Sequence, residues 1–431
     1  MHAWRNGGRT AWLLAIALLV GLAPVAAAQD TTVRGKAGYQ AVYGYTAGEA
    51  VEQALTLRVS LDSRLDFGKL HVDGDAVLPF SGQPLGLQFG QAYVDIYGNS
   101  TDWRIGRQIV SWGTADGINP TNVINPQGAL SPASLALAGE APKGTPVLAV
   151  QGTYYGASGW GFTGVGVAEF VPAETARQIL QAIAARIGGQ MGGGPLPIDG
   201  PAPVPADGSQ IEWAARAEGM IGGHNVYFTY FRGWDDYPAA WIEFTTMPGP
   251  DPTPVPERLA AAYRKVQKLG VATAGTVGPA GLWTELSYTV PEQLPVLDGP
   301  GALSSNGPSV EAVVGADFTF AGGVMVSGQL VYNGGGSLLN PYKEPGAGPS
   351  PQTYLVAVVR YSPEVGHDLQ GTALINAKDG GVLAMGRYTY DINQATRLIL
   401  GAAHVIAGPG SEFREIKPSA DLITAGIEFS F

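Results

Sequence analysis

Four residues at alternate positions of one short segment carry side chains that can exchange protons or bind ions. Lys69, His71, Asp73 and Asp75 are separated by apolar or small residues. Alternate residues of an extended strand share one face, where neighbours lie about 6.6–7 Å apart and rarely converge on one ion. We therefore interpret the segment as a charged wall facing water rather than a metal site, and we expect no metal and no cofactor.

Catalytic chemistry has no recognisable motif in the sequence. The chain of 431 residues has no cysteine, which excludes disulfides, thiol nucleophiles and cysteine-ligated zinc. It also has no Gly-x-Ser-x-Gly elbow, and we expect none of its histidines to pair with a carboxylate at the outer rim, where barrel proteases and phospholipases have their active sites. The net charge of -11 argues against nucleic-acid binding, because phosphate contacts need a basic surface. We expect neither an enzyme nor a nucleic-acid-binding protein.

The N-terminus has the three parts of a secretory signal peptide. Arg5 and Arg9 precede an apolar stretch from Ala11 to Leu22, and small residues follow up to Ala28. We expect cleavage after Ala28, which divides the chain into a signal peptide (1–28) and a single domain (29–431). After residue 28 no run of about 18 apolar residues occurs, so we expect no transmembrane helix.

Alternation of apolar and polar residues with period two recurs along the rest of the chain. It predicts an all-β fold, a transmembrane antiparallel up-and-down barrel of about eighteen strands. Sixteen would be the count if the two weakest segments, 225–234 and 264–277, were not strands. The predicted strands cover 33–45, 50–63, 65–78, 87–97, 102–112, 146–155, 159–170, 210–220, 225–234, 264–277, 280–290, 309–320, 324–332, 352–361, 367–377, 381–391, 395–406 and 420–431.

The predicted connections alternate in length, as expected for a barrel with long external loops and short periplasmic turns. The fourth external loop begins with Pro172-Ala173-Glu174 and is predicted to continue as a helix to about Ile187, and a second short helix is predicted from Glu257 in the fifth. The first, second and eighth external loops are short, so the alternation is imperfect there. The long connections are 113–145, 171–209, 235–263, 291–308, 333–351 and 407–419.

The last strand assigns the two faces of the barrel. Phe429 and Phe431 share the apolar face with Ile427, whereas Glu428 lies on the other. This ending resembles the C-terminal strand signature of bacterial outer-membrane barrels, which the barrel-assembly machinery recognises. Charged side chains must face inward, because a charge at mid-membrane costs about 2–4 kcal/mol on the lipid side. The predicted pore-lining residues are Arg58, Lys69, His71, Asp73, Asp75, Asp95, Glu212, Arg216, Glu285, Arg387, Arg397 and Glu428.

One segment is more distinctive than the strands around it. It contains Gly106-Arg107-Gln108, then Ser111-Trp112-Gly113, then two Asn-Pro pairs at Asn119 and Asn125. This pattern resembles little-characterised porin-like outer-membrane families, and the resemblance implies a structured third loop close to the pore. An equal alternative is that both Asn-Pro turns only pack the loop against the barrel wall. The candidate constriction residues are Trp112, Asp116, Asn119, Asn122 and Asn125.

These patterns together predict a channel in the bacterial outer membrane. We expect small hydrophilic solutes to diffuse through a polar, slightly acidic lumen, with outer-membrane lipid and lipopolysaccharide around the barrel and the assembly machinery binding Phe431. The alternatives are a dedicated conduit for hydrophobic nutrients or exported polysaccharide, and a surface barrel or adhesin without transport. Oligomeric state is not fixed by any sequence feature, and a homo-oligomer is one alternative.

Overall fold

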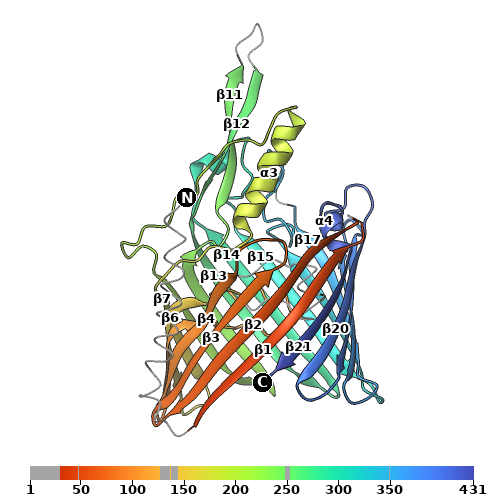
Figure 1. Ribbon diagram of the computed structural model, residues 1–431. Helices are drawn as coiled ribbons and strands as arrows, with labels where there is room; N and C mark the ends of the chain where they lie inside the picture. The colour runs from red at the N-terminus through yellow and green to blue at the C-terminus, as the bar shows by residue number, and fades with distance from the viewer. Residues whose placement is uncertain (1–29, 47, 127–135, 137–143, 248–252, 349) are drawn as a thin grey trace.

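A computed structural model describes residues 30–46, 48–126, 136, 144–247, 253–348 and 350–431. The predicted signal peptide and its cleavage position lie outside the described residues. The main element is a sheet of eighteen antiparallel strands that closes on itself (Figure 1), because β1 pairs with both β2 and the last strand, β21. The strand count is therefore eighteen rather than sixteen.

Each of the eighteen predicted segments forms a strand. The strands of the barrel, in chain order, are β1 (Asp30–Gly44), β2 (Glu49–Leu65), β3 (Gly68–Pro79), β4 (Gly86–Tyr97), β5 (Thr101–Gln108), β6 (Val147–Tyr155), β7 (Gly161–Val167), β9 (Glu212–Ile221), β10 (His224–Trp234), β13 (Lys265–Val277), β14 (Ala280–Pro291), β15 (Ser309–Thr319), β16 (Val324–Asn333), β17 (Gln352–Tyr361), β18 (His367–Asn376), β19 (Val382–Asp391), β20 (Thr396–Ile406) and β21 (Leu422–Ser430).

The outer surface of the barrel is apolar, as the period-two pattern predicts. On β2, Leu55, Leu57 and Val59 are 39–44% exposed although they are aliphatic. Arg58 lies between them in sequence and points the other way, into the barrel, where it meets Asp75 of β3. Aliphatic exposure on this scale suits a surface bathed in hydrocarbon. Among the described residues, no helix is long and apolar enough to cross a membrane.

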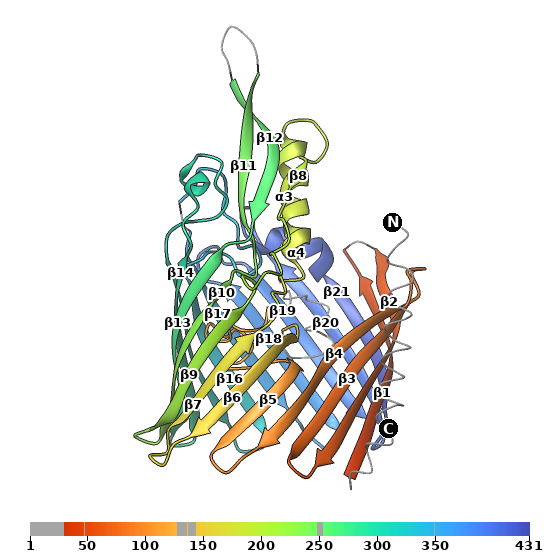
Figure 2. The same cartoon turned by 90° about the vertical axis from the view of Figure 1, so that its left-hand side faces the viewer.

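The two ends of the barrel differ. At one end the strands are joined by short turns, such as residues 66–67 between β2 and β3 and 278–279 between β13 and β14. At the other end, which we call the loop end, long connections rise well above the rim (Figures 1 and 2). The wall includes three short neighbouring strands, β5, β6 and β7, with 8, 9 and 7 residues.

The long loops between β7 and β15 build a small structure on the loop end, which we call the crown. It consists of α3 (Ala176–Gln190), a three-stranded sheet of β8 (Ile198–Asp199), β11 (Ala239–Met247) and β12 (Thr253–Ala262), and the 3-10 turn η1 (Pro295–Asp298). Leu180, Ile183 and Ile187 of α3 pack on the sheet in one buried cluster. The helix predicted in the fourth loop is thus confirmed, with Ile179 only partly buried.

The second predicted helix, from Glu257, is wrong. That segment belongs to β12, which pairs with β11 in a hairpin that rises above the barrel (Figure 2). Arg-Leu-Ala-Ala-Ala has good helix propensity, but pairing with β11 and burial of Leu259 against α3 outweigh that local preference. A short helix in the last loop, α4 (Phe413–Ala420), has no counterpart in the sequence-based expectation.

Candidate functional site

The third loop connects β5 and β6, and its described residues, 109–126, 136 and 144–146, lie inside the barrel instead of above it. The Gln329 amide on β16 donates to the carbonyl oxygen of Asp116 at 2.7 Å. Following the ring from β5 through β6, β7, β9, β10, β13, β14 and β15, β16 is the eighth strand along. A contact between these two parts of the chain therefore crosses most of the barrel interior.

A second contact places the loop against another part of the wall. A Cβ atom added at Gly401 of β20 would lie 2.5 Å from the carbonyl oxygen of Ala136, so the loop backbone lies directly against this strand. Ala136 also belongs to a buried cluster with side chains of β14 to β21 and with Val42 of β1. The loop thus contacts β14, β16 and β20, and its apolar residues also pack on the inner side of β6, β7, β9, β10 and β13.

Glu285 of β14 is the main polar anchor of the loop. Its carboxylate is 2% exposed and accepts hydrogen bonds from the backbone amides of Thr114, Ala115 (2.7 Å) and Thr121 (3.0 Å). The hydroxyls of Thr114 and Thr121 also donate to it, at 3.1 and 2.8 Å. Five donors from one loop converge on a single buried charge, and hydrogen bonds to charged groups are stronger than those between neutral groups.

The base of the loop is held by a different set of contacts. The side chain of Asn125 accepts from the amide of Val110 at 2.7 Å and donates to the carbonyls of Gln108 and Thr145 at 3.1 and 2.8 Å. Gln108 is fully buried and donates to the carbonyl of Ala149. The chain leaves β5 at Gln108, four residues earlier than the predicted end of that strand at 112, because these contacts turn it inward.

The five predicted constriction residues divide by burial. Trp112 and Asn125 are 4% and 1% exposed and take part in the packing of the loop. Asn122 and Asn119 are partly buried, and the Asn122 side chain accepts from the amide of Trp112 at 3.4 Å. Asp116 is exposed, so it is the member of the set whose side chain meets water.

All twelve predicted pore-lining residues face the barrel interior. Asp95, Glu212 and Glu285 are buried there, and most of the others belong to a wall of paired charges. Arg58 and Asp75 form a bidentate pair at 2.6 and 2.9 Å. His71 lies between Asp62 and Asp73, at 2.8 and 2.9 Å. The remaining ion pairs of the set are Lys69–Asp62, Arg104–Asp95, Arg216–Glu218, Arg397–Asp391 and Lys36–Glu428. Arg387 faces the same interior opposite Gly401 and Gln370.

The three alternating ligands suggested by His71, Asp73 and Asp75 do not converge. Asp75 turns to Arg58, whereas His71 is shared between Asp62 and Asp73. No group of three or more His, Asp or Glu residues suited to a metal ion occurs in the part of the chain that the structure describes. The segment forms a charged wall in this structure.

Part of the interior is apolar, so the expectation of a wholly polar lumen is incomplete. Near the loop end, Val313, Val331, Tyr354, Leu383 and Val405 point inward from five strands between β15 and β20. They pack with the third loop and with Phe413 of α4. Loops therefore cover this apolar surface, whereas the inward side chains of Arg58 and Lys36 on β2 and β1 are 66% and 56% exposed.

Several interior residues were not predicted. The Arg104 guanidinium lies 4.0 Å from the centre of the Tyr93 ring. Arg104 lies between Trp103 and Ile105 in sequence, so the period-two pattern could have predicted that it faces inward. Thr121 and Gln329, which position the loop, had no such signal, because a neutral residue facing inward looks the same whether or not a loop covers it.

Comparison with known proteins finds similarity in structure and not in sequence. No family model matches the chain, and no curated protein matches it. Acinetobacter baumannii OccAB4 aligns over 94% of this chain and 99% of its own, with a TM-score of 0.53 and 6% identity. This chain has the same fold.

Two further structures give the same result. Pseudomonas aeruginosa OccK11 (OpdR) aligns over 93% of this chain and 95% of its own, with a TM-score of 0.51 and 10% identity. Pseudomonas aeruginosa OccK5 (OpdH) aligns over 93% and 96%, with a TM-score of 0.50 and 10% identity. At these identities the likeness extends to the fold alone.

Proposed function

We propose that this protein is an outer-membrane channel through which small hydrophilic solutes diffuse, narrowed by its third loop. The observation that carries the proposal is the loop itself, which crosses the interior of a closed barrel and is anchored on Glu285. A barrel that served only as an anchor would not need an internal loop with its own set of wall contacts. The resemblance of the segment from Gly106 to Pro126 to porin-like families supports the same function.

The exposed charged wall on β1 and β2 suggests where solutes pass. The third loop packs on the wall from β6 to β20, and its cluster reaches Val42 near the end of β1, whereas Lys36 and Arg58, further down β1 and β2, remain open to water. We propose that the passage lies between the third loop and β1 to β3. Asp116 is the loop residue proposed to face it, while Trp112 and Asn125 support the loop from within.

The location and export of the protein follow the same proposal. The loop end would face outside and the short turns the periplasm, and the signal peptide would be removed after Ala28. Phe431 pairs with Gly35 of β1 through two backbone hydrogen bonds, at 2.8 and 2.9 Å, which completes the closure of the barrel. We propose that the assembly machinery recognises this strand before it pairs with β1.

Single-channel recording in planar bilayers tests the function. We expect discrete conductance steps from the purified protein, and we expect Asp116→Asn to change conductance or ion selectivity. A protein that inserts but gives no steps would refute the channel. If Asp116→Asn had the same conductance and ion selectivity as the unmodified protein, Asp116 would not be part of the constriction, but the proposed channel function would still stand.

The crown supports a second candidate function, a surface-binding barrel. It has its own buried cluster, so it is more than a set of connections between strands. Deleting 239–262 separates the two functions. Loss of surface attachment with unchanged conductance would favour binding by the crown, whereas unchanged attachment would leave the channel as the function.

A further inference from the structure

Two neighbouring strands carry cations on the membrane-facing side of the barrel at its loop end. On β10, Thr229, Phe231 and Gly233 are buried inside the barrel, so Arg232 between them points outward and is exposed. On β13, Val266 is buried and Lys265 and Gln267 take the outward side.

These cations lie near the ends of their strands, at the height where lipid headgroups would surround the barrel. Arg232 is two residues from the end of β10, and Lys265 is the first residue of β13. Further into the wall, the outward positions of these strands are apolar, with Phe228, Leu269 and Val271 40–52% exposed. A cation near the interface costs about 0–1 kcal/mol, far less than one at mid-membrane.

Aromatic residues surround the pair of cations. Trp213 of β9 lies directly across from Arg232, is 45% exposed and has its ring 4.9 Å from that of Tyr230. On the other side, the Lys265 ammonium lies 5.3 Å from the centre of the Trp234 ring. Tryptophan and tyrosine concentrate at membrane interfaces, and their faces also stack on sugar rings.

The three polar side chains are close enough to share one headgroup. Arg232 is paired with Gln267 in the sheet register, and Lys265 is the diagonal neighbour, about 7–8 Å away in such a ladder. The hydroxyl of Tyr230 donates to the Gln267 side chain at 2.9 Å and so fixes its position. Across the described ranges, no carboxylate lies within 4.0 Å of the Arg232 or Lys265 side-chain nitrogens.

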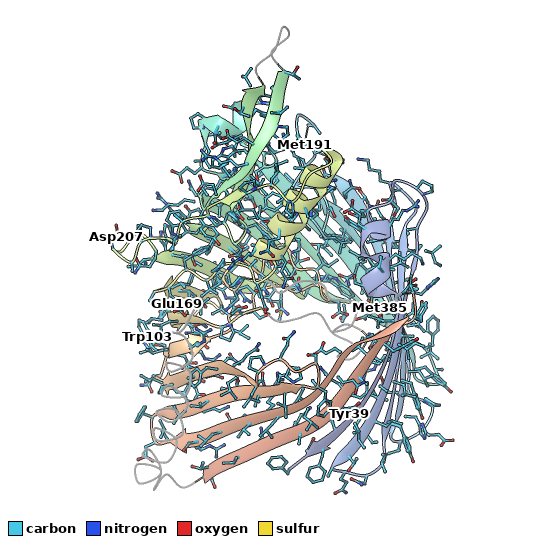
Figure 3. The ribbon with its side chains drawn as sticks, turned by 45° about the horizontal axis from the view of Figure 1, so that its top comes forward. Tyr39, Trp103, Glu169, Met191, Asp207 and Met385 are labelled. Carbon is cyan, nitrogen blue, oxygen red and sulfur yellow. The ribbon has the colours of Figure 1, made fainter. Side chains whose placement is uncertain are left out.

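Two carboxylates lie near this surface without pairing with either cation. Glu292 accepts from the backbone amide of Lys265 at 3.1 Å. Hydrogen bonds from Ser209 lower the pKa of Asp207, and the charge of Lys265 adds a smaller effect in the same direction. Asp207 sits at the end of a loop that projects sideways from the rim (Figure 3). Carboxylates at this place can accept hydrogen bonds from sugar hydroxyls, while the cations and the amide of Gln267 can donate to phosphate.

We propose that Arg232, Lys265 and Gln267, flanked by Trp213 and Trp234, bind the phosphorylated sugar headgroup of an outer-leaflet glycolipid. The cations pair with its phosphate, the indole faces cover its sugar rings, and its acyl chains run down over Phe228 and Leu269. The site rests on the outer-membrane location proposed above and does not depend on conduction through the barrel.

Binding of lipid A to the detergent-purified protein, followed by native mass spectrometry, tests the site. We expect the double variant Arg232→Gln/Lys265→Gln to bind lipid A about tenfold more weakly or worse, because two charge-assisted contacts are lost. The charge-retaining double variant Arg232→Lys/Lys265→Arg should keep most of the binding. Arg107→Gln is the matched control, since Arg107 points outward from the same end of the wall but is paired with Glu169 at 2.9 Å.

The alternative outcomes are distinct. Equal binding by the unmodified protein and the double glutamine variant would overturn the site, as would an equal loss in the Arg107 control. Binding of inorganic phosphate that depends on Arg232 and Lys265, together with lipid A binding that does not, would assign the cations to free phosphate and refute the lipid headgroup. A barrel that is silent in bilayers but shows the expected lipid A pattern would refute the channel and leave this site standing.

Discussion

The carboxylate of Glu285 accepts two hydrogen bonds from Thr121, from its backbone amide at 3.0 Å and from its hydroxyl at 2.8 Å, although 164 positions separate the two residues. One residue belongs to the wall, and the other belongs to a loop that starts at β5, six strands away around the ring. Both are almost fully buried. This pair therefore fixes how far the third loop reaches into the barrel.

Neutralising Glu285 should loosen the loop. In Glu285→Gln, one of the two side-chain oxygens becomes an NH2 group, which cannot accept from the amides of Thr114, Ala115 or Thr121. Leaving buried donors without an acceptor costs about 1–3 kcal/mol each. We expect a larger single-channel conductance and more frequent fluctuation between current levels in planar bilayers.

Glu212→Gln is the control for that measurement. Glu212 is also buried and faces inward, but it accepts from the amide of Trp234 rather than from the third loop. We expect its conductance to match that of the unmodified protein. Identical traces from Glu285→Gln and the unmodified protein would show that the Glu285 contacts do not set the loop position.

A disulfide should replace the Glu285 anchor. An added Cβ at Gly270 of β13 would lie 3.5 Å from Cβ of Thr121, at the lower end of the range for a disulfide. It would also meet the hydroxyl of Thr229 at 2.3 Å, so the design is Thr121→Cys and Gly270→Cys with Thr229→Ala. The natural chain has no cysteine to compete.

The expected result is a reversible rescue. Combined with Glu285→Gln, the oxidised disulfide should restore the lower conductance and the steady current, and reduction should bring back the fluctuating state. Thr229→Ala with Glu285→Gln alone provides the baseline. If oxidation left the current of the combined variant unchanged, loop displacement would not be the cause of the Glu285→Gln effect.

Charge on the open wall should set ion selectivity. Arg58 and Asp75 neutralise each other, and Arg58 is 66% exposed. Arg58→Gln leaves a carboxylate and should increase cation over anion permeability by about twofold in dilute salt, with a smaller effect in concentrated salt because of screening. Asp75→Asn should shift selectivity the opposite way, and the double variant should return close to the starting value. Reversal potentials under a salt gradient measure this, and equal values for all variants would place the passage elsewhere.

The barrel was predictable because one physical requirement repeats along it. Each strand presents apolar side chains to the outside of the barrel and turns every second residue inward, so Leu55, Leu57 and Val59 identify β2 without knowledge of its neighbours. The same rule placed Arg58 and Glu285 inside. It gave no information about which inward residues a loop would cover, since Glu285 and Arg58 follow the same pattern but are 2% and 66% exposed.

The loops were less predictable because their partners are distant in sequence. The segment after Glu257 looks helical by itself, and only its pairing with β11 makes it a strand. Trp112 fits the end of an outward-facing strand by its apolar type, yet it is buried in the third loop. The local sequence pattern therefore predicted α3, because the apolar stripe of this helix lies within one segment. It could not predict contacts between segments that are distant in sequence.

The crown should unfold separately from the barrel. Leu259 of β12 is fully buried in the cluster with Leu180 and Ile183 of α3. Leu259→Ala should destabilise the crown by about 2–5 kcal/mol, the usual range for a buried leucine. We expect faster proteolysis within 172–262 and an unchanged heat-induced shift of the barrel on gels. Val255→Ala, in the partly buried part of the same strand, is the control, and equal resistance of both variants would contradict independent packing of the crown.

The buried carboxylate of Asp421 should make the last loop sensitive to acid. Asp421 follows α4, is 1% exposed and accepts from the Val405 amide, the Thr46 hydroxyl and the Lys417 ammonium, each at 2.7 Å. Burial alone would raise the pKa of Asp421, but the hydrogen bonds from Lys417, Val405 and Thr46 lower it below its ordinary value of 3.8. Because the folded pKa is depressed, the stabilisation is fully present above the unfolded value and is lost as the pH falls through the folded one.

Hydrogen exchange of residues 407–421, corrected for the intrinsic pH dependence, measures this stabilisation. Protection should stay constant from neutral pH down to about pH 4 and then decrease as Asp421 is protonated. Asp421→Asn should exchange faster already at neutral pH, by the equivalent of about 1–3 kcal/mol, and should show no further loss on acidification. Glu415→Gln in α4 is the control, because no ion pair of Glu415 occurs among the described residues and its protonation should leave protection unchanged. Two results would show that this carboxylate does not hold α4 to the rim. One is a loss of protection that begins well above pH 4, and the other is a pH profile of Asp421→Asn that matches that of the unmodified protein.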